Sequence, residues 1–235
     1  MTTEAALRNG HDWAVHKSTS SHEPDIAHTT ALELISYFQN SHALAEISCG
    51  FNVISHNWRE IIDVDGHLPR GMRRELKNSD FTFTIDQQFQ RVMEECAKPR
   101  GETPRWIGNK TMDMLMELYA AGYAHSFDSY KDGKLCGGNI GLSRNGMYIS
   151  LSAYGHCPNA GNASLAPLKK TLFRRGFLFH DAISPSNISR NLGGYLIHRS
   201  EHHERQAEAR KIYVSLPHIP DPLSVAAYIQ PPTHG

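Results

Sequence analysis

Two short turn signals constrain the fold of this chain more than any other feature of its sequence. Asp132-Gly133 and Asn145-Gly146 each separate two runs of mostly alternating apolar and polar residues. Asp-Gly and Asn-Gly tolerate the left-handed backbone that a two-residue hairpin turn requires. The sequence therefore predicts three consecutive antiparallel strands, over Tyr123–Tyr130, Leu135–Leu142 and Met147–Tyr154.

The segments around these strands predict a mixed α/β protein. Apolar spacing, caps and glycine stops indicate five helices and three further strands. The helices are Arg70–Asn78, a helix capped by Asp86 and running to Ala97, one from Asn109 or Thr111 to Ala121, Asn162–Arg175 and Ser200–Lys211; the strands are Phe81–Ile85, Phe177–Ile183 and Tyr195–Ile197. The stretch from Asn57 to His67 gives no clear signal.

Three antiparallel strands followed by a helix and another strand are typical of acetyltransferase-like folds. We therefore expect a mixed, mainly antiparallel sheet with helices on both faces, plus a small N-terminal domain. Substrates of such folds usually bind where a central strand separates from its neighbour, although this placement is an analogy between folds.

Composition and local pattern divide the chain into an arm, two domains and a tail. Residues 1–28 are polar and rich in His and Ser, which favours a mobile arm. Residues 29–69, with a helical pattern over Thr30–Gln39, are expected to form the small N-terminal domain, and residues 70–214 the domain with the acetyltransferase-like fold. Residues 215–235 are rich in proline and are expected to lie extended on the surface.

Charge and cysteine content limit the class of protein. Lys and Arg together number 24, as do Asp and Glu, so a strongly basic nucleic-acid binder is disfavoured while a local basic patch stays possible. The four cysteines are scattered without a CxxC pair, which favours free thiols in a reducing compartment. No apolar run reaches the roughly 18 residues of a membrane span. We therefore expect a cytoplasmic protein that does not bind membranes.

Several stretches together carry a family resemblance. The phrase Gly122-Tyr123-Ala124-His125-Ser126 is followed at family spacing by Asp132-Gly133 and Gly137-Gly138. Further matching stretches are Arg70–Ala97, Arg105–Ile107, Asn162–Ser164 and the span from Asp181 to Gly194. Over about Phe51 to Tyr195 the chain resembles the leucyl/phenylalanyl-tRNA–protein transferases.

The resemblance implies an activity and its site. Family members move leucine or phenylalanine from aminoacyl-tRNA to the α-amine of proteins that begin with Arg or Lys, and no cofactor is implied. This chemistry calls for an apolar pocket for the donor side chain and an aromatic surface for the terminal adenine. Trp106 matches the tryptophan near the adenosine, and Asp181 matches the catalytic aspartate. The bland alternatives are a core anchor for Trp106 and a turn or cap residue for Asp181.

The chain departs from the family at its reaction centre. Leu151 stands where the family has a glutamate, and Ile183 where it has the glutamine that is given a role in accepting the amine proton. Neither side chain can accept a proton. A paired Trp-Trp aligns with Val53-Ile54, and a tyrosine aligns with Leu115.

These departures shape the expected site. Together with Trp106, four residues are expected to bind substrate: Leu151, Ser152, Asn162 and Ile183. Apolar neighbours should raise the pKa of Asp181 unless Arg or backbone N–H groups compensate.

Basic residues follow two predicted helices at spacings that place several on a common face. They could contact tRNA phosphates or simply be solvated. The candidate tRNA-binding residues are Arg70, Arg73, Arg74, Lys169, Lys170 and Arg174.

Two other constellations give weaker signals. His198 and His202 stand four apart and could share a metal, but no third ligand is evident and exposed helix histidines are favoured. Arg190–Gly194 is a poor match to a pyrophosphate-binding loop, because Tyr195 follows where a small residue is needed.

Three functions stay open at this point. The first is an aminoacyltransferase with an altered site, acting between aminoacyl-tRNA and a protein or peptide N-terminus. The second is a non-catalytic relative that binds a ligand or partner. The third is a small-molecule acyltransferase that uses coenzyme A.

Overall fold

A computed structural model of the chain describes residues 42–47, 50–55, 57–99 and 107–230. Its main element is an eight-stranded sheet in the order β10-β4-β5-β6-β7-β8-β3-β9. These strands are β3 (Trp58–Asp63), β4 (Thr82–Ile85), β5 (Ala124–Lys131), β6 (Lys134–Arg144), β7 (Met147–Gly155), β8 (Phe179–Ile183), β9 (Tyr195–His198) and β10 (Ile219–Ser224). Strands β1 (His42–Ile47) and β2 (Gly50–Ser55) pair with each other in a separate sheet.

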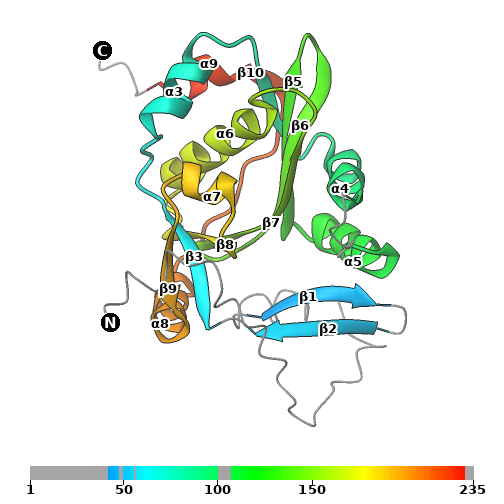
Figure 1. Cartoon of the computed structure of the whole chain (residues 1–235), viewed down its shortest axis with the longest axis vertical. Coiled ribbons are helices and arrows are strands. Elements are labelled where there is room, and N and C mark those ends of the chain that lie inside the picture. The colour runs from blue at the N-terminus through cyan, green and yellow to red at the C-terminus, as the bar shows by residue number, and fades with distance from the viewer. Residues whose placement is uncertain (1–41, 48–49, 56, 100–106, 231–235) are drawn as a thin grey trace.

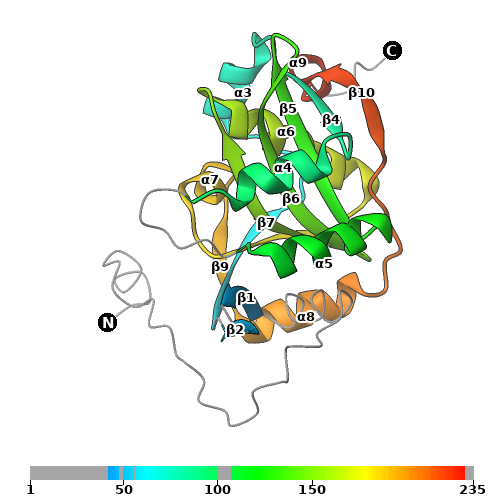
Figure 2. The same ribbon diagram turned by 90° about the vertical axis from the view of Figure 1, so that its right-hand side faces the viewer.

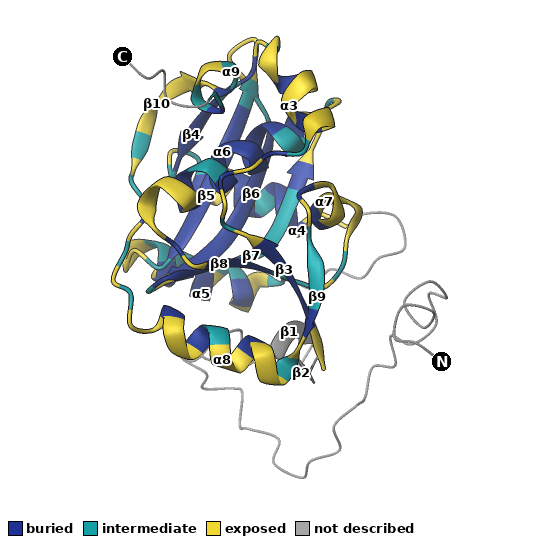
Figure 3. Cartoon of the chain, turned by 90° about the vertical axis from the view of Figure 1, so that its left-hand side faces the viewer, coloured by how far each residue is buried: buried dark blue, intermediate teal, exposed yellow. Residues whose placement is uncertain are grey.

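Helices cover both faces of the large sheet, as the sequence predicts. Figure 1 shows α6 on one side of the central strands and α4 and α5 on the other, and Figure 2 views the face that carries α4 and α5. The described helices are α3 (Arg70–Lys77), α4 (Phe89–Ala97), α5 (Asn109–Ala120), α6 (Ala160–Arg175), α7 (Asn187–Asn191), α8 (Arg199–Ala209) and α9 (Val225–Tyr228). Each face has its own cluster of buried apolar side chains, so the central strands are buried on both sides (Figure 3).

The three-strand meander is confirmed. β5, β6 and β7 pair antiparallel in sequence, with Lys131 opposite Lys134 and Arg144 opposite Met147. Asp132 and Gly133 have φ of 51° and 71°, and Asn145 has φ of 57°. Asp, Asn and Gly adopt this left-handed region at the lowest cost, which explains why these dipeptides fix the turns.

Gly141 on β6 is required by close packing. A Cβ at this position would overlap the Tyr148 ring and the Ile149 carbonyl oxygen, both on β7. We expect Gly141→Ala to lower the free energy of unfolding by about 1–3 kcal/mol, measured by urea denaturation, because the buried tyrosine must shift. Gly71→Ala is the matched control: its Cβ would meet nothing within 4 Å, so this helical site should be stabilised by about 1 kcal/mol. Equal effects would contradict this interpretation.

A helical crossover leads from the meander into the second half of the sheet. β7 is followed by α6 and then by β8, which pairs parallel to β7 from Met147–Phe179 to Ile149–Asp181. Beyond Ile149 the two strands separate, while β8 continues along β3 as far as the pair Glu60–Ile183. The sheet therefore opens at the position where the fold analogy predicts a substrate site.

The predicted cap of α4 is wrong. Asp86 has φ of 64° and does not cap the helix; its carboxylate accepts from the Ser126 N–H and lies 2.7 Å from His125 Nδ1. The buried Asp128 carboxylate instead accepts from the N–H groups of Gln87 and Gln88, just before the helix begins. His125 of the family motif is thus a buried, hydrogen-bonded residue.

Two segments outside the range 70–214 complete the large sheet. β3 falls in the stretch that gave no clear signal, yet it lies between β8 and β9. β10 runs through the proline-rich tail and pairs with β4. The tail is thus extended over β10, while α9, which also lies within the tail, is helical and buries Val225. The polar arm 1–28 and the expected helix Thr30–Gln39 lie outside the described residues.

Candidate active site

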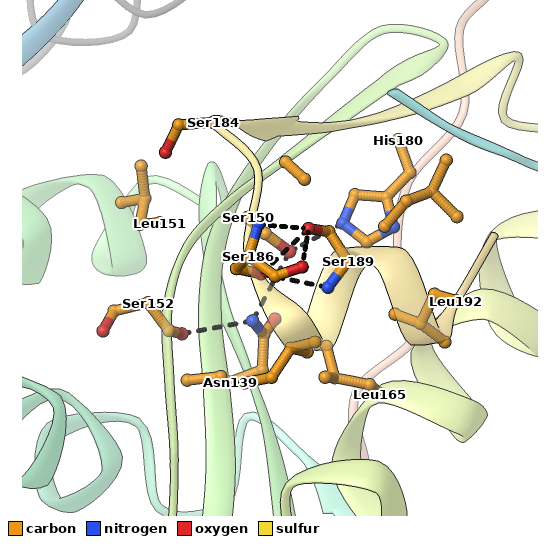
Figure 4. A pocket seen from close by; sticks show the side chains of 14 residues that line it. Asn139, Ser150, Leu151, Ser152, Leu165, His180, Ser184, Ser186, Ser189 and Leu192 are labelled. Carbon is orange, nitrogen blue, oxygen red and sulfur yellow. Dashed lines mark hydrogen bonds between the residues drawn. The ribbon is translucent and has the colours of Figure 1, made fainter. Parts of the chain in front are cut away.

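A cavity of about 250 Å³ lies where β7 and β8 separate. Its lining comes from β7, from β8 with the turn that follows, from α7, and from single residues of β3, β6 and α6 (Figure 4). The lining residues are Ile62, Asn139, Ser150, Leu151, Ser152, Ala153, Leu165, His180, Ala182, Ser184, Ser186, Ile188, Ser189 and Leu192. Aliphatic side chains therefore share this cavity with hydroxyl, amide and imidazole groups.

A chain of hydrogen bonds forms the polar wall of the cavity. The Tyr148 hydroxyl donates to Asn139 Oδ1 at 2.9 Å, and Asn139 Nδ2 donates to the Ser152 carbonyl oxygen at 3.1 Å and to Ser150 Oγ at 3.4 Å. Ser150 Oγ lies 2.6 Å from His180 Nε2. Because Ser150 Oγ accepts from Asn139, its own hydrogen is available to His180. Figure 4 shows Asn139, Ser150, Ser152 and His180 among the side chains that line the cavity.

His180 is held in its neutral form. Its side chain is 1% exposed, and burial lowers the pKa of His180 to about 4, against the opposing effect of the Asp181 charge. Nδ1 of its ring is buried and has no hydrogen-bond partner within the described part of the chain. The histidine therefore contributes an uncharged polar surface at neutral pH.

Asp181, the predicted catalytic residue, lies in a fully buried ion pair. Its Oδ2 accepts from Arg59 Nη2 at 2.6 Å and from Arg59 Nε at 3.2 Å, and lies 2.9 Å from His202 Nε2. Its Oδ1 accepts from the Ile183 N–H at 2.7 Å. The side chains of Asp181, Arg59 and His202 are each 0% exposed. The carboxylate therefore ties β8 to β3 and α8.

The ion pair determines the pKa of Asp181. Burial alone would raise this pKa, but the Arg59 charge and the bond from His202 lower it below the usual range. The sequence predicts a raised pKa for Asp181 unless an arginine or backbone N–H groups compensate for burial. Arg59 and the Ile183 N–H do so here, which agrees with the lowered pKa. The next turn holds Ile183 at φ of 65°, which is unusual for a β-branched residue and marks a constrained segment beside the cavity.

The residues predicted to bind substrate are only partly brought together. Leu151 and Ser152 line the cavity. Ile183 lies between two lining residues, Ala182 and Ser184, and packs with the apolar cluster on the α4 side of the sheet. Asn162 is in the first turn of α6, where its amide donates to Asn159 Oδ1, and it does not line the cavity. Trp106 lies outside the described residues.

The basic residues divide into a surface group and one buried lysine. The predicted role of Lys169 is wrong, because its ammonium is buried, donates to the Leu192 carbonyl oxygen and pairs with Asp65 at 3.3 Å. Lys170 is half-buried on α6. Its pKa is lowered mainly by burial and further by the positive charges of Arg174 and Arg73. These neighbours show that α3 and α6 bring their positive charges close together. Arg70, Arg73 and Arg74 are exposed on α3.

The histidines of α8 do not form the exposed set that the sequence favoured. His202 is buried and bound to Asp181. His198 Nδ1 caps the N-terminus of α8 by accepting a hydrogen bond from the Ser200 N–H. Within the described ranges, the structure brings together no group of three potential metal ligands.

Sequence reasoning missed three residues of this region. Arg59 lies in the stretch without a clear signal, and its pairing with Asp181 spans 122 residues. Ser150 and His180 are the chain neighbours of Leu151 and Asp181, but a serine and a histidine on different strands carry no local signal. The parallel pairing of β7 and β8 was the available clue, since it places Tyr148 opposite His180 and Ser150 within reach.

Comparison with known proteins identifies the family. Residues 61–207 match the family "Leucyl/phenylalanyl-tRNA protein transferase". The relative of that name from Rhodospirillum rubrum is 31% identical over 66% of this chain and 73% of its own length. The one from Paracoccus denitrificans is 35% identical over 66% and 72%. The chain belongs to this family of aminoacyl-tRNA–protein transferases, which confirms the resemblance.

A likeness to solved structures is much weaker. The C-terminal domain of a putative lysylphosphatidylglycerol synthetase from Agrobacterium fabrum has a TM-score of 0.43 and 10% identity, and it covers 79% of this chain and 71% of that domain. In the described part of the chain, every helix is too short or too polar to cross a membrane.

Proposed function

We propose that this chain moves an amino acid from aminoacyl-tRNA to the α-amine of a protein or peptide, with the donor's aminoacyl group in the cavity between β7 and β8. The observation that carries the proposal is the position of this cavity: it opens where the sheet of an acyltransferase-like fold separates, and Leu151 and Ser152 line it. Membership of the transferase family supports the same reaction.

The bonds and the proton of the transfer reaction can be accounted for without a basic residue in the cavity. The acceptor nitrogen attacks the ester carbonyl carbon, a C–N bond forms, and the C–O bond to the ribose of the tRNA breaks. The amine proton ends on the departing ribose oxygen, directly or through water. Leu151 and Ile183 cannot take this proton, and burial keeps the pKa of His180 at about 4, so it is a weak base.

In this proposal Asp181 is a positioning residue. Its carboxylate is enclosed by Arg59, His202 and the Ile183 N–H, and it fixes β8 and the turn after it. Trp106 keeps its proposed role beside the adenosine, and Asn162 its proposed role as a polar support.

The basic residues of α3 and α6 provide a surface for tRNA phosphates. Leu165 lines the cavity and Lys170 follows five residues later on α6, which is about 8 Å along the helix axis. Arg174 continues the row, with its guanidinium 4.2 Å from the centre of the Tyr228 ring. The surface is thus close enough to the cavity for the tRNA backbone near its acceptor end.

This surface gives a prediction for tRNA binding. Lys170→Ala and Arg73→Ala should each weaken binding and reduce the slope of log affinity against log salt by roughly one unit, because each removes one phosphate contact. Lys134→Ala, exposed on the β5–β6 hairpin, is the matched control and should keep the slope. Fluorescence anisotropy across a salt series measures all three, and an unchanged slope in both test variants would remove this surface from the tRNA site.

Transfer itself tests the proposed function. The chain is incubated with a mixed pool of radiolabelled aminoacyl-tRNAs and with peptides that begin with Arg, Lys, Asp or Glu. Label in a peptide supports the proposal and identifies the acceptor class. Label that stays on tRNA for every peptide, with tRNA binding retained, supports the alternative below.

A non-catalytic binding protein is the second candidate. The loss of proton-accepting groups at Leu151 and Ile183 favours it, as does the enclosure of Asp181. Such a protein would bind the aminoacylated end in the same cavity without transfer. Binding of aminoacyl-tRNA with no transfer to any peptide would establish it.

A further inference from the structure

The cavity between β7 and β8 has an uncharged polar wall in which His180 Nδ1 and the Ser152 hydroxyl have no hydrogen-bond partner within the described part of the chain, and a hydrocarbon side chain would leave both unpaired. We infer that the donor amino acid of this chain has an uncharged side chain that forms hydrogen bonds, instead of the leucine or phenylalanine side chain that the family resemblance implies. The inference rests on the proposed function and names the substrate class of the same site.

The polar wall is buried and already oriented. Asn139 and His180 are each 1% exposed, and both bind the half-buried Ser150. After Ser150 has accepted from Asn139 and donated to His180, its oxygen keeps one acceptor position. The Ser152 hydroxyl has no partner within the described residues and also lines the cavity. These groups offer hydrogen bonds at the cavity surface.

Other lining residues are aliphatic. Ile62, Leu165 and Leu192 line the cavity, and each is at most 2% exposed. The donor side chain therefore contacts hydrocarbon as well as hydroxyl, amide and imidazole groups. A side chain with an apolar part and an uncharged polar group, as in Thr, Asn or Tyr, matches both kinds of surface.

The absence of charged residues from the cavity lining disfavours a donor amino acid with a charged side chain. Among the lining residues, all of which are described, there is no Asp, Glu, Lys or Arg. His180 is neutral at pH 7, since burial lowers its pKa to about 4. Two buried acidic groups outside the lining already have partners: Asp181 pairs with Arg59, and Glu60 accepts from the Ser186 N–H and the Ser189 hydroxyl. A charged donor side chain would thus be buried without a charged residue in the lining, which is costly.

A site built to hydrogen-bond its ligand discriminates strongly against an apolar isostere, because its own polar groups are then left unpaired. An apolar pocket, in contrast, discriminates weakly against an added hydroxyl. Pairs of donors with equal shape and different polarity therefore separate the two kinds of pocket. Suitable pairs are Thr and Val, Asn and Leu, and Tyr and Phe.

The test measures binding without requiring transfer. Short RNAs ending in CCA carry each amino acid through an amide in place of the ester, so that they cannot react, and calorimetry gives their dissociation constants. In the pair that binds most tightly, we expect the polar member to bind about tenfold or more better. Equal binding, or tighter binding of the apolar member, overturns the inference while leaving the proposed function in place.

A variant tests whether the polar wall causes the preference. Ser150→Ala removes one hydroxyl and keeps the backbone, so it should reduce the preference about tenfold. Ser215→Ala, on an exposed residue after α8, is the control and should keep the preference. If Ser150→Ala is folded by circular dichroism and keeps the full preference, the assignment of the wall is wrong. If no RNA binds to wild type at low salt, both this inference and the proposed function fail.

Discussion

Asp181→Ala is expected to lower the free energy of unfolding by about 3–5 kcal/mol. The substitution removes the carboxylate but leaves the Arg59 guanidinium in the interior, where the side chain is 0% exposed. Within the described part of the chain, Nη1 of Arg59 already has no hydrogen-bond partner, so little is available to replace the lost bonds. An uncompensated buried charge is among the most destabilising changes that a single substitution can cause.

Urea denaturation of matched variants measures this effect. Asp113→Ala, at an exposed position of α5, is the control and should change the free energy of unfolding by less than about 0.5 kcal/mol. The double substitution Arg59→Met with Asp181→Leu should recover most of the loss, because it removes both charges together. A loss below about 1 kcal/mol for Asp181→Ala would show that the carboxylate is not part of a buried ion pair.

A further variant separates a positioning role of Asp181 from a direct chemical one. Asp181→Asn keeps the shape of the side chain and an acceptor for the Ile183 N–H. If Asp181 acts only through the position of β8, transfer by this variant should follow its folded fraction and retain the wild-type pH profile. A fully folded Asp181→Asn protein without transfer would instead place the carboxylate in contact with substrate.

The meander and the crossover could be predicted because their signals are local. Asp132-Gly133 and Asn145-Gly146 fix two turns by backbone preference alone, and Gly176, with φ of 78°, ends α6. These turns fix the register of neighbouring strands, and the register in turn places Leu151 and Ser152 beside the cavity. Local signals therefore predicted the meander and the crossover, while the expected position of the opening came from an analogy between folds.

The cap of α4 and the surroundings of Asp181 depend on distant partners. Asp128 accepts from the Gln88 N–H across 40 residues, whereas local spacing favours the nearer Asp86 as the cap. Arg59 lies on a strand whose pattern is uninformative, because β3 is buried in its middle and apolar and charged residues share that burial. An ion pair that overrides local patterning cannot be found from periodicity.

Lys169 shows the same limit on charge patterning. Spacings of three and four residues place basic residues on one helix face, but they do not say whether that face meets solvent. The α6 face that carries Lys169 packs toward Leu192 and Asp65, where the ammonium finds a carbonyl oxygen and a carboxylate. The neighbouring Lys170 is half-buried beside Arg73 and Arg174, so one position along the helix separates a structural cation from a candidate phosphate contact.

The stability of the wild-type chain should fall by about 3 kcal/mol between pH 6.5 and pH 4 because of His180. Burial lowers the pKa of His180 to about 4, while in the unfolded chain it titrates near its usual value of 6.5. Between these values the unfolded state binds more protons than the folded state, so acid favours unfolding. Each unit of difference in pKa corresponds to about 1.4 kcal/mol.

His180→Met should remove this pH dependence, because no buried imidazole then resists protonation. His218→Met is the control: His218 is exposed, so this variant should lose stability with acid as the wild type does. Urea denaturation at half-unit pH steps from 7 to 4 measures all three proteins. Asp181 does not disturb this window, because a carboxylate with a lowered pKa loses its contribution only as the pH falls below about 4. An equal slope in His180→Met and wild type would show that the imidazole is accessible to protons in the folded chain, and the wall of the cavity would then carry a charge in mild acid.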